Sequence, residues 1–162
     1  TAQVFCRSRE GLASPDLQLL FTPASYDPRQ FGVLEREPGM TVAVCPVRPD
    51  SRGTILARSA DPFEKPAIRP NYLSAPSDRR VLMAGLRLTR DIFAQPAIAR
   101  HSAFEMVPGP DVRSDEEMVE YIRGYGTTIY HPVGTCRMGE DPASVVDSRL
   151  RVRGIGGLRV IQ

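Results

Sequence analysis

Residues 130–139 read YHPVGTCRMG, and this decapeptide is the most informative stretch of the chain. It places His131, one of two histidines, directly before Pro132. Proline fixes its own φ and restricts the residue before it to extended geometry, so we expect His131 on a stiff, non-helical segment. Gly134 and Gly139 allow tight turns or the close approach of another surface. The pattern predicts a loop that holds one titratable side chain in a fixed direction.

Taken alone, a loop histidine has more than one interpretation. Most often it is hydrogen-bonded scaffolding, and less often it is a catalyst. Cys136, five residues further on, is a third possibility as the nucleophile of a thiol hydrolase, although no residue of the pattern supplies the orienting group of such a site. The residues of the decapeptide leave these interpretations open.

Composition limits the classes of protein that the chain can represent. At 162 residues it is one domain with a core, or a large piece of a bigger protein. The 41% of hydrophobic residues, the 25% of charged residues and the lack of a run of about 20 apolar residues are typical of a soluble protein. A net charge of +2 with scattered arginines argues against nucleic acid as a partner.

The N-terminus and the cysteines indicate the compartment. The chain begins TAQVFCRSRE, without the order of a secretory signal and without an initiator methionine, so we expect the true start to lie upstream. The three cysteines are odd in number, far apart and without a CxxC pair, which predicts reduced thiols and no metal site. We expect a cytoplasmic location, with peripheral membrane association of the parent left open.

Strand signals precede the decapeptide. Residues 15–23, PDLQLLFTP, alternate between proline boundaries and predict a strand. Residues 40–49, MTVAVCPVRP, predict a second strand at an edge or bulge because Pro46 lacks a ladder donor. TILARS at residues 54–59 follows a short polar link, so we expect an antiparallel hairpin between these two segments. Residues 60–76 hold four prolines and predict an ordered loop, anchored by the apolar side chains of Phe63, Ile68 and Tyr72.

Two helices are expected. Residues 74–95 show helical periodicity, with Ser74 as N-cap, Pro96 as the stop and four arginines on a solvated face, namely Arg79, Arg80, Arg87 and Arg90. Residues 97–101 add at most one further turn. Ser114 with Glu117 three residues later marks the start of the second helix. Its buried stripe is expected to hold Met118, Ile122 and Tyr125.

The tail after the decapeptide predicts paired strands. Leu150 and Val152 alternate with arginines, and a further apolar segment follows GIGG at residues 154–157. GIGG is neither GxGxxG nor a phosphate loop, so it predicts a turn between strands. Asp147 is expected to cap the turn before the first of them.

The decapeptide resembles the catalytic-histidine segment of the glucose-methanol-choline (GMC) family of flavin-dependent oxidoreductases. Further segments resemble the C-terminal half of choline-dehydrogenase-like members in order and spacing, and they cover nearly the whole chain: PDLQLLFTP, PVRPDSRGTILARSADPFEKPAIRPNYLS, DRRVLMAGLRLTRDIFAQPA and VVDSRLRVRGIGGLRVI. Several long segments in one order make a chance match improbable.

The resemblance implies an α+β fold. An antiparallel sheet backed by helices would form the substrate-binding domain over the isoalloxazine ring of FAD, and the last strand would return to an FAD-binding domain. The N-terminal GxGxxG of the family does not occur in this sequence. Residues 1–162 are therefore expected to be a single partial domain without its FAD-binding domain.

The resemblance also implies the site residues. His131 matches the active-site histidine, which accepts the alcohol proton or holds the forming alkoxide while hydride moves to flavin N5. Tyr130, Pro132, Val133 and Gly134 match the segment beside the flavin and are the expected cofactor-binding residues. The second catalytic residue of the family lies beyond Gln162. Many members carry an acidic residue where this chain has Gln162.

The expected function is the substrate-domain part of an FAD-dependent, choline dehydrogenase-like enzyme that oxidises a primary alcohol to an aldehyde. Its partners are a small-molecule alcohol and the FAD-binding domain of the parent protein, and the chain alone is expected to be inactive. Choline, other amino alcohols, aliphatic alcohols and aromatic alcohols all agree with the resemblance. The alternative is a non-catalytic interaction module that retained the fold.

Overall fold

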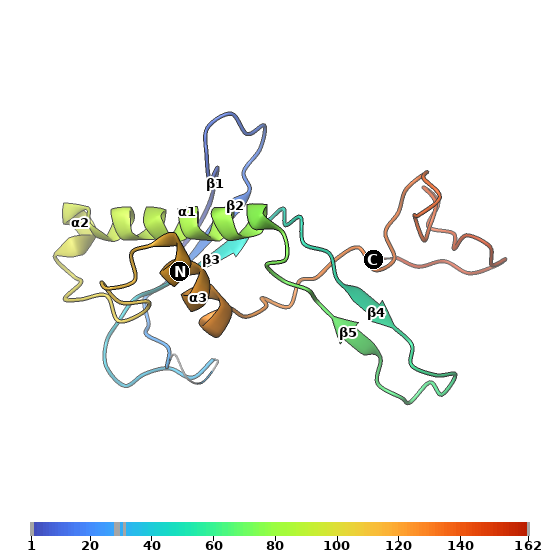
Figure 1. The fold of residues 1–162 in the computed structure, drawn as a ribbon, viewed down its shortest axis with the longest axis horizontal. Helices are drawn as coiled ribbons and strands as arrows, with labels where there is room; N and C mark the ends of the chain where they lie inside the picture. Colours follow the sequence, from blue (N-terminus) through green and yellow to red (C-terminus); the bar gives the residue numbers. More distant parts are fainter. Residues whose placement is uncertain (1, 28–29, 31, 162) are drawn as a thin grey trace. The chain divides into compact units, whose positions relative to one another are not determined.

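The structure is a computed structural model that describes residues 2–27, 30 and 32–161 (Figure 1). It divides into two compact units, and each is described by itself. We call Thr1–Arg52 with Tyr72–Gly126 the sheet–helix unit, and Gly53–Asn71 with Thr127–Gln162 the loop unit. A single partial domain over residues 1–162 stays a prediction.

The sheet–helix unit contains a three-stranded antiparallel sheet. Its strands are β1 (Ala2–Cys6), β2 (Leu17–Thr22) and β3 (Thr41–Pro46), in the order β1-β2-β3. Leu17 and Leu19 of the central strand point to one face and are buried. The strand predicted at residues 15–23 is confirmed, and so is the edge position of the segment that contains Pro46. β1 was not predicted from the sequence.

The expected hairpin between residues 40–49 and 54–59 was wrong. β3 pairs with β2, whereas β4 (Thr54–Leu56) pairs with β5 (Ala67–Arg69) in a separate two-stranded sheet of the loop unit. After β3, the backbone N–H groups of Asp50 and Ser51 donate to the carboxylate of Asp78 at 2.8 and 2.9 Å. These bonds fix the chain to the start of α1 after β3 ends.

The segment with four prolines also differs from its prediction. β5 occupies the proline-free residues between Pro66 and Pro70, where a short edge strand keeps its ladder donors. The apolar side chains expected to anchor this segment are all exposed: Phe63, Ile68 and Tyr72. The expected burial of these anchors was therefore wrong.

Helix α1 (Pro76–Phe93) packs on the sheet (Figure 1). A Cβ atom added to Gly85 would overlap Val44 and come within 2.9 Å of Leu17 Cδ1, so glycine permits the close approach of helix and sheet. The N-cap is Ala75 and makes no side-chain cap bond, so the prediction of Ser74 was wrong. Pro76 starts the helix with a fixed φ and without an N–H that needs a partner.

Helices α2 (Pro96–Ala99) and α3 (Asp115–Tyr125) follow. The capping box predicted for Ser114 and Glu117 is confirmed at the start of α3. Met118 and Ile122 are buried as expected, and they form a core with Met83 of α1. Tyr125 is exposed and stacks on Tyr121, with ring centroids 5.1 Å apart, so its predicted burial was wrong.

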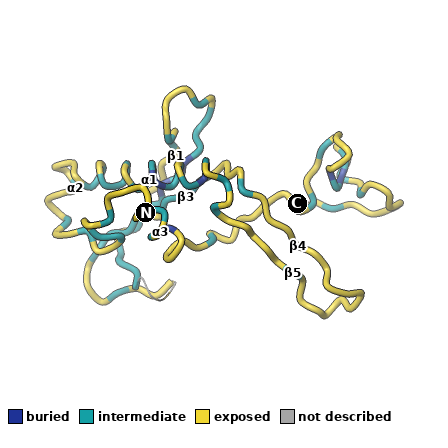
Figure 2. The backbone as a smooth tube through the Cα atoms, in the orientation of Figure 1, coloured by how far each residue is buried: buried dark blue, intermediate teal, exposed yellow. Residues whose placement is uncertain are grey.

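Figure 2 shows that buried positions are few. In the sheet–helix unit they lie in β2 and β3 and where α1 and α3 pack, and in the loop unit they lie in the tail. The α+β fold with an antiparallel sheet backed by helices is confirmed. Within the described residues, no helix is long and apolar enough to cross a bilayer.

Candidate functional site

The five predicted site residues lie together on an exposed segment of the loop unit. His131 and its four neighbours, Tyr130, Pro132, Val133 and Gly134, are all exposed and non-helical. Tyr130 is 67% exposed and Val133 is 85% exposed, one on each side of His131 and Pro132 in the sequence. The segment thus presents an imidazole beside an uncovered apolar surface.

Two positive φ angles shape this segment. Tyr130 has φ +61° and Gly134 has φ +94°. A left-handed conformation costs a non-glycine residue roughly 1–2 kcal/mol, and such residues gather at functional sites. The backbone N–H of Tyr130 donates to Thr128 Oγ1 at 3.0 Å. His131 is therefore held between a strained residue and the fixed φ of Pro132.

Arg137 anchors the chain just after this segment. Its N–H donates to the carbonyl of Gly134 at 3.3 Å, which closes a turn, and its carbonyl accepts from the N–H groups of Val145 and Val146 at 3.0 and 3.3 Å. Its guanidinium bonds both oxygens of Asp141, at 2.8 and 2.6 Å. These bonds lower the pKa of Asp141 to about 2 and raise the pKa of Arg137.

Gly139, the last residue of the decapeptide, is held from two sides. Its N–H donates to the carbonyl of Val146 at 3.1 Å, beside a parallel bridge between Met138 and Val146. Its carbonyl lies 2.7 Å from Ser144 Oγ and accepts from Arg153 Nη2 at 2.7 Å. Arg153 Nε donates to Ser144 Oγ at 3.0 Å. We call Gly139, Ser144 and Arg153 the Gly139 clamp.

A hairpin completes the loop unit. The N–H of Val152 donates to the carbonyl of Leu158 at 3.0 Å, and the N–H of Val160 donates to the carbonyl of Leu150 at 3.1 Å. GIGG is thus a turn between paired segments, as predicted, although the pairing is limited to isolated bridges. Asp147 Oδ1 accepts from the N–H groups of Arg149 and Arg151 at 2.9 and 3.0 Å, which confirms its predicted capping role.

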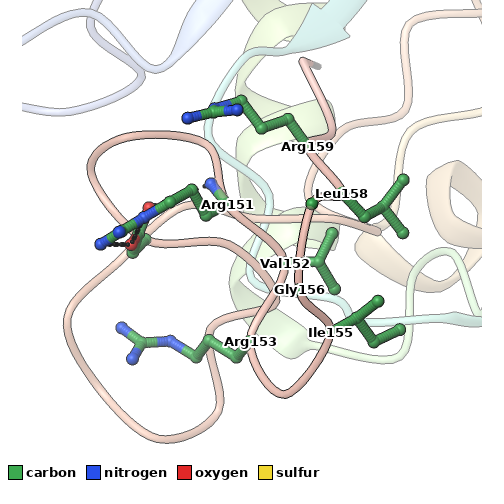
Figure 3. Close-up of a pocket in the computed structure, with 9 residues that line it drawn as sticks. Arg151, Val152, Arg153, Ile155, Gly156, Leu158 and Arg159 are labelled. Atoms are coloured by element: carbon green, nitrogen blue, oxygen red, sulfur yellow. Dashed lines mark hydrogen bonds and ion pairs between the residues drawn. The ribbon is translucent and has the colours of Figure 1, made fainter.

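The hairpin borders an open hollow of about 400 Å³ (Figure 3). Val152, Ile155 and Leu158 gather on one side of it, whereas the side chains of Arg151 and Arg153 extend to the other side of the hairpin. His131 does not line this hollow. Its walls combine apolar and basic side chains, and it is not the place where the predicted site residues meet.

The exposed segment has open space and apolar side chains available for contact with another group. No atom lies within 4 Å of the Cβ position of Gly134, so the backbone there can approach another surface closely. Exposed Tyr130 and Val133 offer apolar contacts on either side of His131. The flavin ring that the family resemblance implies has this chemistry, whereas the described residues hold no cluster of three or more metal-ligating side chains.

The clamp was not predicted from the sequence. Ser144 and Arg153 lie 13 and 22 residues after His131, and neither belongs to a pattern with a known chemistry. The alternation of apolar residues and arginines in the tail predicted only paired strands. The three cysteines form no disulfide within the described part of the chain.

Comparison with known proteins identifies relatives over almost the whole chain. It is 46% identical over 157 residues to an alcohol dehydrogenase [acceptor] of Pseudomonas putida, which covers 97% of this chain and 28% of that protein. It is 40% identical to a choline oxidase of Arthrobacter globiformis, over 97% of this chain and 30% of that protein. The chain therefore spans less than a third of the length of these curated relatives.

Solved structures show the same fold. A pyridoxine 4-oxidase from Mesorbium loti matches with a TM-score of 0.81 at 27% identity, over 93% of this chain and 30% of that one. A formate oxidase of Aspergillus oryzae, a protein with FAD modification, matches with a TM-score of 0.77 at 29% identity, over 91% and 26%. Residues 49–162 match the family model described as GMC oxidoreductase. The chain belongs to the GMC oxidoreductase family.

Proposed function

We propose that this chain is the substrate-binding part of an FAD-dependent alcohol oxidoreductase that converts a primary alcohol to an aldehyde. The observation that carries the proposal is the identity of 46% to an alcohol dehydrogenase and 40% to a choline oxidase, each over 97% of the chain. These relatives favour choline or a similar alcohol as the substrate class. The described residues of the chain supply a histidine suited to this chemistry.

His131 is the proposed catalytic residue. Its imidazole is exposed on a segment stiffened by Pro132, so it can meet the hydroxyl of a bound alcohol. Imidazole accepts a proton near neutral pH, and the resulting imidazolium stabilises negative charge on the alcohol oxygen. FAD, when bound, supplies the acceptor for the hydride that leaves the carbon. His131 thereby holds the proton while the carbon is oxidised.

Tyr130, Pro132, Val133 and Gly134 are the proposed contacts to the cofactor. Their exposure leaves them accessible to a ring, and their place next to His131 would bring substrate and cofactor to the same segment. They orient the reactants and take no proton.

The chain by itself is proposed to be inactive. Its sequence has no GxGxxG for the FAD pyrophosphate. The second catalytic residue is proposed to follow Gln162, which lies outside the described residues. The functional partner is therefore an FAD-binding domain of the parent protein.

Replacement of His131 in the full-length protein tests the catalytic role. His131→Ala should lower kcat by about 10²–10⁴-fold with FAD still bound, which is the range for loss of a general acid–base group. His101→Ala is the matched control, because His101 is the other histidine and lies exposed in the sheet–helix unit. Near-wild-type turnover of the flavin-loaded His131 variant would refute the proposal.

Titration with FAD tests whether the 162-residue chain binds the cofactor by itself. The purified 162-residue chain should leave the absorbance and fluorescence of FAD unchanged, whereas the full-length protein should perturb both. Tight binding by the 162-residue chain would show that it holds a cofactor site of its own, and this result would contradict the proposed inactivity.

A further inference from the structure

We propose that Arg153 is a positioning residue for His131, acting with Ser144 through the carbonyl of Gly139; this inference rests on the proposed function of His131. The decapeptide has two ends with opposite properties. His131 lies at the exposed end, whereas Gly139 lies at the end that the clamp fixes. In this proposal the Gly139 end helps to fix the direction of His131, together with the restraints on Tyr130 and Pro132.

The clamp combines a buried serine with an arginine that bonds two acceptors. Ser144 is 4% exposed, and its hydroxyl lies 2.7 Å from the carbonyl oxygen of Gly139 and 2.6 Å from that of Asp141. The guanidinium of Arg153 reaches two acceptors at once, Ser144 Oγ through Nε at 3.0 Å and the Gly139 carbonyl through Nη2 at 2.7 Å. A planar fork can satisfy both acceptors in one orientation, and a lysine ammonium cannot.

Tight packing around Gly139 supports the same inference. A Cβ atom at this position would come within 3.0 Å of Asp141 Oδ2 and 3.2 Å of both Arg137 Nη1 and Ser144 Cβ. The backbone of residue 139 thus sits in a space shaped by the side chains that hold it. Glu140 adds a weaker contact, with its Oε2 3.9 Å from Arg153 Nη2.

A continuous backbone path leads from the clamp to His131. The carbonyl of Arg137 accepts from Val145 and Val146, and the turn from Arg137 back to Gly134 closes at 3.3 Å. Beyond that turn only Val133 and Pro132 separate the path from His131, and Pro132 has a fixed φ. We therefore expect a displacement of Gly139 to reach His131 through this path.

The size of the expected effect follows from the precision that proton transfer needs. A misplacement of about 1 Å caused by a distant change can lower turnover by about 10²-fold. The clamp residues make no contact with the reactants in the proposed mechanism. Their loss should thus lower kcat more than it raises KM, with FAD binding retained.

Three variants of the full-length, FAD-loaded protein test the inference: Arg153→Ala, Arg153→Lys and Ser144→Ala. We expect kcat to fall about 10- to 100-fold in both Arg153 variants, with KM for the alcohol changing far less. Millimolar guanidinium should restore part of the kcat of Arg153→Ala and none of the kcat of Ser144→Ala. Arg149→Ala is the matched control, because Arg149 lies exposed on the same hairpin, and its turnover should equal that of the wild type.

Several results would overturn the positioning role. A kcat of Arg153→Lys equal to that of the wild type would show that the fork is not needed. The loss of kcat could instead follow from less bound FAD or from a lower thermal midpoint, without rescue by guanidinium. This result would show that the clamp has only a structural role. If Arg153→Ala fails to fold, Arg153→Lys and Ser144→Ala decide the question by the same measurements.

His131→Ala, assayed in parallel, separates this inference from the proposed function. Near-wild-type turnover in His131→Ala contradicts the proposed function. Loss of turnover in His131→Ala together with near-wild-type turnover in both Arg153 variants contradicts only the positioning role.

Discussion

Arg90 and Glu105 form a forked ion pair, with Nε 3.0 Å from Oε2 and Nη2 2.8 Å from Oε1. The same guanidinium donates to the carbonyls of Val112 and Gly109, at 2.7 and 3.0 Å. Arg90 therefore links α1 to the segment that leads into α3. The sequence predicted only a solvated arginine at this position, and that prediction was wrong.

Arg90→Lys should lower the free energy of unfolding by about 1–3 kcal/mol, because an ammonium cannot satisfy these acceptors together. Urea unfolding followed by circular dichroism measures the change. Arg80→Lys is the control, since Arg80 is exposed on the same helix. Equal midpoints for the two variants would show that the Arg90 network contributes nothing.

Gly85→Ala should destabilise the chain although alanine is the better helix former. The added Cβ would meet Val44 and lie within 2.9 Å of Leu17 Cδ1. Overpacking costs about 1–3 kcal/mol, which exceeds the gain of about 1 kcal/mol in helix propensity. Gly124→Ala in α3 is the matched control, because no atom lies within 4 Å of its Cβ position, and it should stabilise. Thermal midpoints that rise in both variants would contradict the close packing of α1 on the sheet.

Ser114→Ala should cost about 0.5–2 kcal/mol, because it removes the side chain that accepts from the Glu117 N–H at the start of α3. Ser74→Ala should change stability by less than about 0.5 kcal/mol, since Ser74 is exposed and is not the N-cap of α1. Chemical denaturation of the two variants side by side makes the comparison. A larger loss from Ser74→Ala would reverse the assignment of the caps.

Asp147 should stay ionised in strongly acidic solution. The side-chain hydrogen bond from Arg151, followed by the backbone N–H groups of Arg151 and Arg149, lowers its pKa to about 2. Because the folded pKa lies below the unfolded value of about 4, the stabilisation is complete above about pH 4 and is lost as pH falls through about 2. NMR titration of the carboxyl carbon measures the pKa. Arg151→Ala should raise it toward the unfolded value, and an unchanged pKa would rule out Arg151 as the main cause.

The elements that the sequence predicted well are those whose signal is local. β2 shows alternation between proline boundaries, and α3 begins with a capping box that needs only Ser114 and Glu117. β1 was missed because most of its residues are exposed and show no alternation of buried positions. Strand pairing depends on distant contacts, so the sequence predicted the wrong partner for β3.

The candidate site shows the same difference between local signals and distant contacts. His131 and its neighbours are consecutive, so a resemblance could indicate all of them. The Gly139 clamp joins the decapeptide to Ser144 and Arg153, and only folding brings these together. A serine and an arginine of this kind carry no recognisable spacing. Their role becomes visible only in the hydrogen bonds.

The hydrogen bonds that Asp78 accepts from Asp50 and Ser51 have a consequence for how the protein can change over evolution. Ser51 Oγ also accepts from the N–H of Ala75. Hydrogen bonds between residues 50–51 and residues 75–78 therefore hold together the two ends of the segment 53–71. Each doubling of the length of a flexible closed loop costs only about 0.6 kcal/mol. Insertions and deletions in this segment should therefore accumulate without disturbing α1 or the sheet.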